Sequence, residues 1–245
     1  MKKNIDNWIY ELPIAHRGLH NEVFPENTEG AFLNAISHGY AIETDIQMTL
    51  DGVLVCYHDD NLKRGLNIDK DIRTLSFSEI KDLKPFNGEY NIMTFSEFLS
   101  LVDGQVPLML EIKNQKNKGI EEKVVSELKG YTGKFAIQSF NPFIIKNISK
   151  LAPEITVGVL HSREHVNYIS KFSNWFLKNL VCRFIMKFDF LSVRVEDLAF
   201  YKNKYQKLNV ITWTINSEDK LKIAEKFAKN IIFELPLSNL GKFEK

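Results

Sequence analysis

The sequence has few cysteines and little charge imbalance. Its two cysteines, Cys56 and Cys182, lie in apolar surroundings and do not have CxxC spacing. This favours two buried free thiols, and a disulfide is not needed in a domain of this length. The net charge is +1 over 245 residues, without long runs of one sign. Nucleic acid is therefore not expected as the main partner.

Long apolar runs are also missing. No window reaches the roughly 18 apolar residues that a spanning helix needs, and residues 1–10 lack the apolar core of a signal peptide. We therefore expect a soluble protein in the cytoplasm, a reducing compartment. Because no linker rich in proline, glycine or serine divides the chain, we expect one domain over residues 1–245, with a small insertion at about 49–90.

Apolar strand-like runs alternate with helical patterns along the whole chain. The predicted strands are 13–16, 41–46, 107–112, 134–138, 156–160, 188–192, 209–214 and 230–234. The predicted helices are 28–38, 94–102, 119–128, 142–151, 164–180, 195–206 and 218–226. Such alternation indicates a parallel sheet with crossover helices. Eight repeats at this length predict an α/β fold of the TIM (β/α)8 barrel type.

Two local signals are clear. Asn27 or Thr28 is expected to cap the first helix, and the glycine of His38-Gly39 suits the left-handed position after its last turn. Asp51-Gly52 is a turn signal, followed by an alternating run that leads to His58. We therefore expect a hairpin at the start of the insertion.

Three acidic residues form the first candidate site. Glu43 and Asp45 are two apart on a predicted strand and therefore point to one face. Glu111 and Lys113 repeat this spacing on the next strand of the barrel. Buried like charges are costly unless a cation neutralises them, and carboxylates without a nearby cysteine favour Mg²⁺ or Ca²⁺ over zinc. The alternative is a structural cluster of ion pairs in the barrel mouth.

Two histidines lie beside this acidic set in the predicted barrel. His16 ends the first strand, and His58 follows the hairpin. Each has a charged neighbour, Arg17 or Asp59, which weakens the alternative that both are ordinary core residues. An imidazole pair can act as general base and general acid near neutral pH. Asp59 either orients His58 or is a surface partner.

Fixed positive charge completes the candidate site. The guanidinium of Arg17 matches two phosphate oxygens, and Lys113 supplies a point charge. A metal would polarise a phosphoryl oxygen or activate an attacking hydroxyl. Together these groups suit a phosphate diester, with one histidine deprotonating the nucleophile and the other protonating the leaving alkoxide.

At this point the sequence resembles the glycerophosphodiester phosphodiesterase family, from about residue 14 to residue 236. The matching stretches are His16-Arg17-Gly18, Pro25-Glu26-Asn27-Thr28, Ala31-Phe32, Ile42-Glu43-Thr44-Asp45, Thr49-Leu50-Asp51-Gly52, His58-Asp59, Leu110-Glu111-Ile112-Lys113, Gln138-Ser139-Phe140-Asn141 and Trp213-Thr214-Ile215-Asn216. Each motif alone is modest, but their order and spacing are specific.

The resemblance implies a TIM barrel with an insertion after the second strand, and it implies a role for each candidate residue. It gives Glu43, Asp45 and Glu111 to one divalent metal, His16 and His58 to acid–base catalysis, Arg17 and Lys113 to the phosphate, and Trp213 to the glycerol moiety. The implied reaction releases sn-glycerol 3-phosphate and an alcohol such as choline or ethanolamine. The nucleophile is either water or the neighbouring glycerol hydroxyl of the substrate.

The sequence departs from the family pattern at two places. Phe233-Glu234 stands where the family usually has Thr-Asp after the last strand. Gly65 replaces the threonine that usually follows Arg64, so the loop there is expected to shape a different leaving-group pocket.

Two functional alternatives remain. A basic, aromatic-rich stretch at 171–190 is either an ordinary crossover helix or a membrane-facing or lid element. This stretch mildly favours an alternative function as a lysophospholipase D or sphingolipid-type phosphodiesterase on the same barrel. A barrel that binds a phosphorylated ligand without catalysis is the other alternative.

Overall fold

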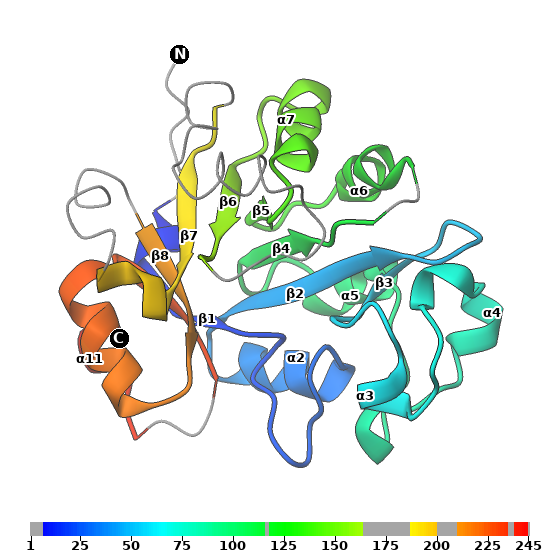
Figure 1. Cartoon of the computed structure of the whole chain (residues 1–245), viewed down its shortest axis with the longest axis horizontal. Coiled ribbons are helices and arrows are strands. Elements are labelled where there is room, and N and C mark those ends of the chain that lie inside the picture. Colours follow the sequence, from blue (N-terminus) through cyan, green and yellow to red (C-terminus); the bar gives the residue numbers. More distant parts are fainter. Residues whose placement is uncertain (1–6, 116–117, 164–186, 200–209, 235–237, 245) are drawn as a thin grey trace. The chain divides into compact units, whose positions relative to one another are not determined.

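Parallel strands that alternate with helices make up the chain in the computed structural model (Figure 1). The structure describes residues 7–115, 118–163, 187–199, 210–234 and 238–244. The chain divides into two compact units. The first unit is Ile14–Phe135, and the second unit is Met1–Pro13 together with Ala136–Lys245. The single-domain assignment stays a prediction.

The first unit is built on β2 (Ala41–Met48), in which every residue is buried. This strand pairs in parallel with β1 (Ile14–Ala15) and β4 (Leu108–Ile112), and antiparallel with β3 (Leu54–Cys56). The helices of this unit are α2 (Glu29–Ser37), α5 (Phe95–Val102) and α6 (Ile120–Leu128). Because side chains alternate along a strand, Glu43, Asp45 and Gln47 share one face of β2.

The predicted hairpin and insertion are present in this unit. The turn between β2 and β3 closes through Thr49, whose backbone N–H donates to the carbonyl of Val53 (2.9 Å). The insertion continues through α3 (Lys63–Leu66), η1 (Ile72–Thr74), α4 (Phe77–Ile80) and η2 (Pro85–Asn87). Its apolar side chains form a small core of their own around Leu62, Ile72 and Ile80. The insertion is therefore a packed structure.

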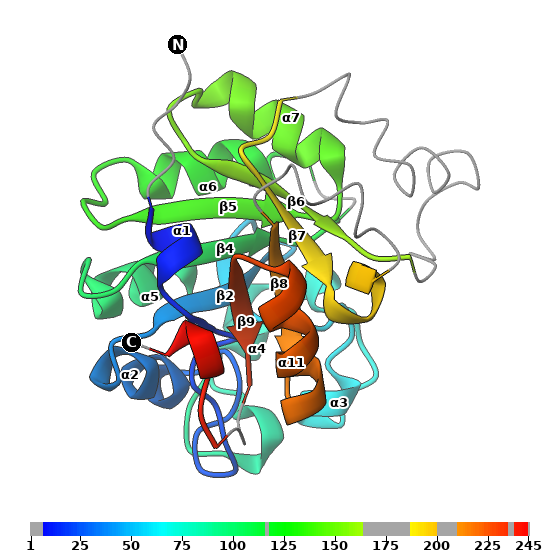
Figure 2. The ribbon, with the colours of Figure 1, turned by 90° about the vertical axis from the view of Figure 1, so that its left-hand side faces the viewer.

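The second unit contains α1 (Trp8–Glu11), β5 (Phe135–Ser139, except its first residue), α7 (Pro142–Leu151), β6 (Val157–His161), β7 (Phe190–Arg194), β8 (Val210–Ile215), α11 (Glu218–Phe227), β9 (Asn230–Phe233) and η3 (Gly241–Phe243). Its strands β5 to β9 pair in parallel in chain order (Figure 2). A Cβ atom on Gly158 would lie 2.2 Å from the Phe190 ring. The glycine therefore lets β6 and β7 pack around a large aromatic ring.

The predicted strands and helices that the structure describes in full have observed bounds within two residues of the prediction, and the largest differences are at β2, which ends two residues later, and at β7, which lies two residues further along the chain. The described residues contain no helix long and apolar enough to cross a membrane. Cys56 is a buried free thiol, as expected. Some predictions fall outside the described residues. These are Cys182, the helix predicted at 164–180, most of the helix predicted at 195–206 and most of the stretch 171–190.

Candidate active site

Three carboxylates come together in the first unit. Asp45 on β2 and Glu111 on β4 are register partners, and Glu43 lies two residues before Asp45 on the same face of β2. One oxygen from each carboxylate lies within 4.8 Å of the others, and all three residues are buried. The structure therefore brings together the acidic set that the sequence predicts for a metal.

Two cations face these acids. Lys113 Nζ donates to Asp45 Oδ1 (3.0 Å) and to Glu111 Oε1 (2.8 Å), and Arg17 Nε lies 3.4 Å from Asp45 Oδ2. Burial alone would raise the pKa of Asp45, but the positive charges of Lys113 and Arg17 beside it hold that pKa well below its usual range. Asp45 is therefore ionised at neutral pH.

Glu43 lies in a different environment. The backbone N–H of Arg17 donates to its Oε2 (3.0 Å), while its Oε1 is buried without a hydrogen-bond partner among the described residues. Burial, and then the charges of Asp45 and Glu111, raise the pKa of Glu43 well above its ordinary value. A buried carboxylate oxygen with no donor beside two other acids is what a hard divalent cation would neutralise. The donor set therefore fits a hard divalent cation.

A tight turn brings His16 and Arg17 to this cluster. Arg17 and Gly18 have positive φ angles of 55° and 78°. The Gly18 N–H donates to the carbonyl of Glu43 (3.2 Å), and a Cβ atom there would lie 2.8 Å from Ala31. Only glycine fits both demands. The turn leaves His16 Nε2 3.8 Å from Glu43 Oε2.

Asn27 supports the acids instead of capping the first helix. Its Nδ2 donates to Asp45 Oδ2 (3.0 Å), and its Oδ1 accepts from Thr44 Oγ1 (2.8 Å). Thr28 occupies the N-cap position of α2, but its hydroxyl donates to the carbonyl of Pro25 (2.6 Å) and makes no cap. Thr28 therefore stands at the predicted N-cap position, but neither side chain makes a capping hydrogen bond, because both bond other polar partners.

The imidazole of His58 is bonded to the neighbouring Asp59. Its Nδ1 lies 2.6 Å from Asp59 Oδ1. Burial would raise the pKa of Asp59, but hydrogen bonds from His58 and Arg64 lower it well below the usual range. The carboxylate is therefore ionised and can only accept, so Nδ1 carries the proton and Nε2 is left to exchange one. Asp59 contacts His58 directly, which favours the orienting role.

Gln47 fixes the backbone on both sides of His58. Its Nε2 donates to the carbonyls of Tyr57 (2.9 Å) and Asp59 (2.8 Å). Gln47 is fully buried on the same face of β2 as Glu43 and Asp45. Sequence reasoning missed this residue, although its i+4 spacing from Glu43 continues the pattern of the two acids.

A charged network joins the histidine to the acids. Arg64 donates from Nε to Asp59 Oδ2 (2.5 Å), and from Nη1 and Nη2 to Glu26 Oε2 (3.0 Å) and Oε1 (2.6 Å). Arg17 Nη1 also donates to Glu26 Oε1 (2.8 Å). Burial would raise the pKa of Glu26, but these two arginines outweigh it and lower that pKa. Glu26 lies in a motif noted above, yet sequence alone assigned it no role.

Trp213 lies in the second unit, on β8, and its ring packs edge-on against Phe140 at 5.5 Å. Its assignment to the glycerol moiety stays a prediction. Glu234 follows β9, where its backbone N–H donates to the carbonyl of Ile215 (2.9 Å).

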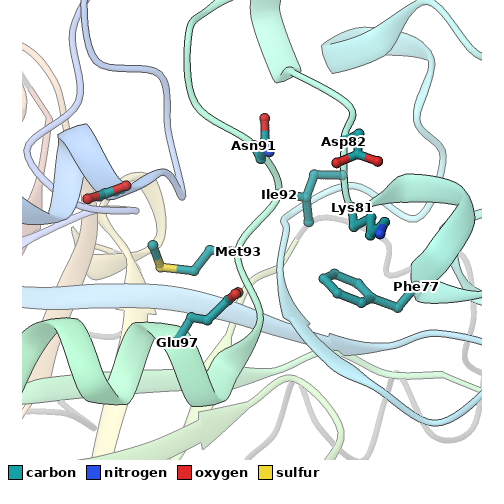
Figure 3. A pocket seen from close by; sticks show the side chains of 8 residues that line it. Phe77, Lys81, Asp82, Asn91, Ile92, Met93 and Glu97 are labelled. Atoms are coloured by element: carbon teal, nitrogen blue, oxygen red, sulfur yellow. The ribbon is translucent and has the colours of Figure 1, made fainter.

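A surface pocket of about 350 Å³ lies elsewhere in the first unit (Figure 3). It is lined by Glu29, Phe77, Lys81, Asp82, Asn91, Ile92, Met93 and Glu97. Glu97 Oε2 already accepts from the backbone N–H and hydroxyl of Thr94, as the cap of α5. None of the predicted site residues lines this pocket.

Comparisons with known proteins identify the family of this chain. The glycerophosphoryl diester phosphodiesterase family profile matches residues 16–233. A glycerophosphodiester phosphodiesterase from Caldanaerobacter subterraneus subsp. tengcongensis is 36% identical over 163 residues, which are 61% of this chain and 66% of that protein. The match therefore spans slightly less than two thirds of that relative.

Solved structures show the same fold. A glycerophosphodiester phosphodiesterase from Parabacteroides distasonis is 23% identical with a TM-score of 0.72, covering 92% of this chain and 93% of that chain. An Oleispira antarctica phosphodiesterase, in complex with the product sn-glycerol-3-phosphate, is 25% identical with a TM-score of 0.71, covering 91% and 93%.

The fold and the acidic site define a TIM-barrel protein with a carboxylate cluster that could hold a metal. The chain belongs to the glycerophosphoryl diester phosphodiesterase family. The predicted fold and family are thus confirmed.

Proposed function

We propose that this protein is a phosphoric diester hydrolase that cleaves glycerophosphodiesters to sn-glycerol 3-phosphate and an alcohol. The observation that carries this proposal is the clustering of Glu43, Asp45 and Glu111 within 4.8 Å, with a histidine and two cations around them. Family membership and the product named for the Oleispira protein support the substrate class.

The three carboxylates would hold one divalent metal, Mg²⁺ or Ca²⁺. When bound, the metal supplies positive charge to a phosphoryl oxygen or an attacking hydroxyl. The unsatisfied Oε1 of Glu43 supports this assignment. The lysine bonded to Asp45 and Glu111 keeps the cluster from carrying the full charge of three acids.

His16 and His58 exchange the protons of the reaction. One takes the proton of the nucleophile, and the other gives a proton to the leaving alkoxide. The Asp59 bond leaves Nε2 of His58 as its reactive nitrogen.

Arg17 and Lys113 bind the phosphate. In the structure both cations contact Asp45, which holds them in place beside the acidic cluster. A bound phosphate would therefore find two positive charges that are already positioned. Lys113 keeps one further donor besides the two that bond the acids. Positive charge fixed in advance stabilises the negative charge on the phosphoryl oxygens in the transition state.

The direct test is hydrolysis of glycerophosphocholine and glycerophosphoethanolamine, with release of sn-glycerol 3-phosphate as the readout. We expect turnover with Mg²⁺ or Ca²⁺, none with excess chelator, and recovery when the metal is returned. Absence of turnover with every divalent metal would leave a barrel that binds phosphorylated ligands. Faster turnover of a lysophospholipid would favour the lipid phosphodiesterase.

The nucleophile is tested separately. The reaction is followed in ¹⁸O-labelled water. A cyclic 1,2-phosphate that forms early and then decays indicates attack by the neighbouring glycerol hydroxyl. Incorporation of one ¹⁸O atom into the product without any cyclic phosphate indicates direct attack by water. A cytoplasmic location stays a prediction from the sequence.

A further inference from the structure

Arg64 uses all three nitrogens of its guanidinium at one point of the charged network. Nε donates to Asp59, and Nη1 and Nη2 donate to the two oxygens of Glu26. The planar guanidinium therefore binds Asp59 through its Nε edge and Glu26 through its two terminal nitrogens. A lysine cannot reproduce that geometry, because its ammonium is a point charge.

The carboxylates of Asp59 and Glu26 connect Arg64 to His58 and to Arg17. Asp59 accepts from His58 on Oδ1 and from Arg64 on Oδ2, so its orientation is set from both sides. Glu26 Oε1 is shared by Arg64 and Arg17, and Arg17 Nε lies 3.4 Å from Asp45. An unbroken chain of contacts therefore runs from the imidazole of His58 to a carboxylate of the acidic cluster.

Phe86 holds Arg64 from the other end of the insertion. The Arg64 guanidinium carbon lies 4.9 Å from the centre of the Phe86 ring. Phe86 has φ 60°, and Asn87 beside it has φ 55°. Two adjacent non-glycine residues with positive φ are unusual, and such strain persists where surrounding contacts demand it. The stacked ring restricts an arginine side chain that is 47% exposed.

We propose that Arg64, stacked on Phe86, is a positioning residue that fixes His58 relative to Arg17 through Asp59 and Glu26. Arg64 does not itself move a proton. The proposal rests on the proposed function, because it assigns His58 and Arg17 to one reaction.

The test is a double-mutant cycle with glycerophosphocholine at saturating metal. Arg64→Met should lower kcat about 10- to 100-fold with little change in KM. Arg64→Lys should recover only part of the loss. In the His58→Ala background, Arg64→Met should add almost nothing, because residues that act as one unit are not additive. Phe86→Leu should lower kcat in the same direction, but less.

Lys63→Met is the matched control, since it removes the same charge from the neighbouring, exposed position of α3. It should leave kcat at the wild-type value. Equal losses for Arg64→Met in the wild-type and His58→Ala backgrounds would overturn the proposal, because Arg64 would then act independently of His58.

A second measurement does not depend on turnover. In ¹H–¹⁵N spectra of the histidine side chains, the Nδ1–H of His58 should be protected from exchange, and its signal is identified by its loss in His58→Ala. Arg64→Met should remove that protection, while Lys63→Met should keep it. An unchanged signal in Arg64→Met overturns the positioning role. Loss of protection in a chain that hydrolyses no diester would overturn the proposed function alone.

Discussion

Asp45 and Glu111 are register partners on adjacent parallel strands, and Lys113 Nζ bonds both of them. Glu43 shares their site without a cation bonded to its Oε1. The acids are therefore unequal: Asp45 is held ionised, whereas burial and then its acidic neighbours oppose ionisation of Glu43. Glu43 is the member whose charge depends most on a bound cation.

We expect Mg²⁺ or Ca²⁺ to stabilise the protein against unfolding. A ligand that binds only the folded state adds about 2.7 kcal/mol at one hundred times its Kd. Thermal unfolding with metal and with chelator measures the shift in Tm. Glu43→Gln should reduce that shift strongly, whereas Glu97→Gln, on α5, should keep it. Equal shifts in both variants would contradict the assignment.

We expect His16→Ala and His58→Ala each to lower kcat by about 10²- to 10⁴-fold, because each removes a proton donor or acceptor. The Tm shift caused by metal should persist in both variants, since neither histidine is a proposed ligand. His38→Ala, at the exposed end of α2, is the control and should keep full activity. Unchanged kcat in either site variant would make its acid–base assignment wrong.

We expect Gln47→Met to lower both stability and kcat. The change leaves the carbonyls of Tyr57 and Asp59 without their shared donor, at a cost of roughly 1–3 kcal/mol for each buried group. The chemically matched control is Gln105→Met, because Gln105 Nε2 also donates to two carbonyls, but at the exposed end of α5. That control should keep kcat. A stability loss without a change in kcat would show that Gln47 does not position His58 for the reaction.

The sequence predicts the acidic cluster because spacing along a strand determines which side chains share a face. Glu43 and Asp45 follow from period-two alternation, and Glu111 follows from the order of parallel strands. The link between Arg64 and Glu26 could not be predicted, because these residues are 38 positions apart and meet only through the folding of the insertion. Gln47 was missed because a neutral amide on a buried strand signals no chemistry.

We expect Glu26→Gln to destabilise the protein at neutral pH but not in acid. The folded-state pKa of Glu26 lies below its ordinary value of 4.5, because the two arginines outweigh its burial. Its ionised form therefore adds stability above about pH 4.5, and that stability is lost as pH falls through the folded pKa. The Tm difference between wild type and Glu26→Gln, measured from pH 7 to pH 3, should shrink on the acid side. A constant difference would contradict this coupling.

The position after Arg64, Gly65 inside α3, has too little room for a side chain. A Cβ atom on Gly65 would lie 2.5 Å from the hydroxyl of Tyr57 and 3.4 Å from the Phe86 ring. Phe86 is also the ring that stacks on the Arg64 guanidinium. The glycine that replaces the family threonine is therefore matched to Tyr57.

We expect Gly65→Ala to destabilise the protein by about 1–3 kcal/mol, the usual cost of overpacking, and to lower kcat by displacing Arg64. Tyr57→Phe removes the obstructing hydroxyl, so the double variant Gly65→Ala/Tyr57→Phe should recover most of both losses. Thermal unfolding and kcat on glycerophosphocholine measure the rescue. Gly130→Ala serves as the control for adding a methyl group, because a Cβ atom there meets nothing within 4 Å, although its φ of +90° adds backbone strain. It should lower Tm without lowering kcat. If the double variant were no better than Gly65→Ala alone, crowding against the Tyr57 hydroxyl would not be the reason for the glycine.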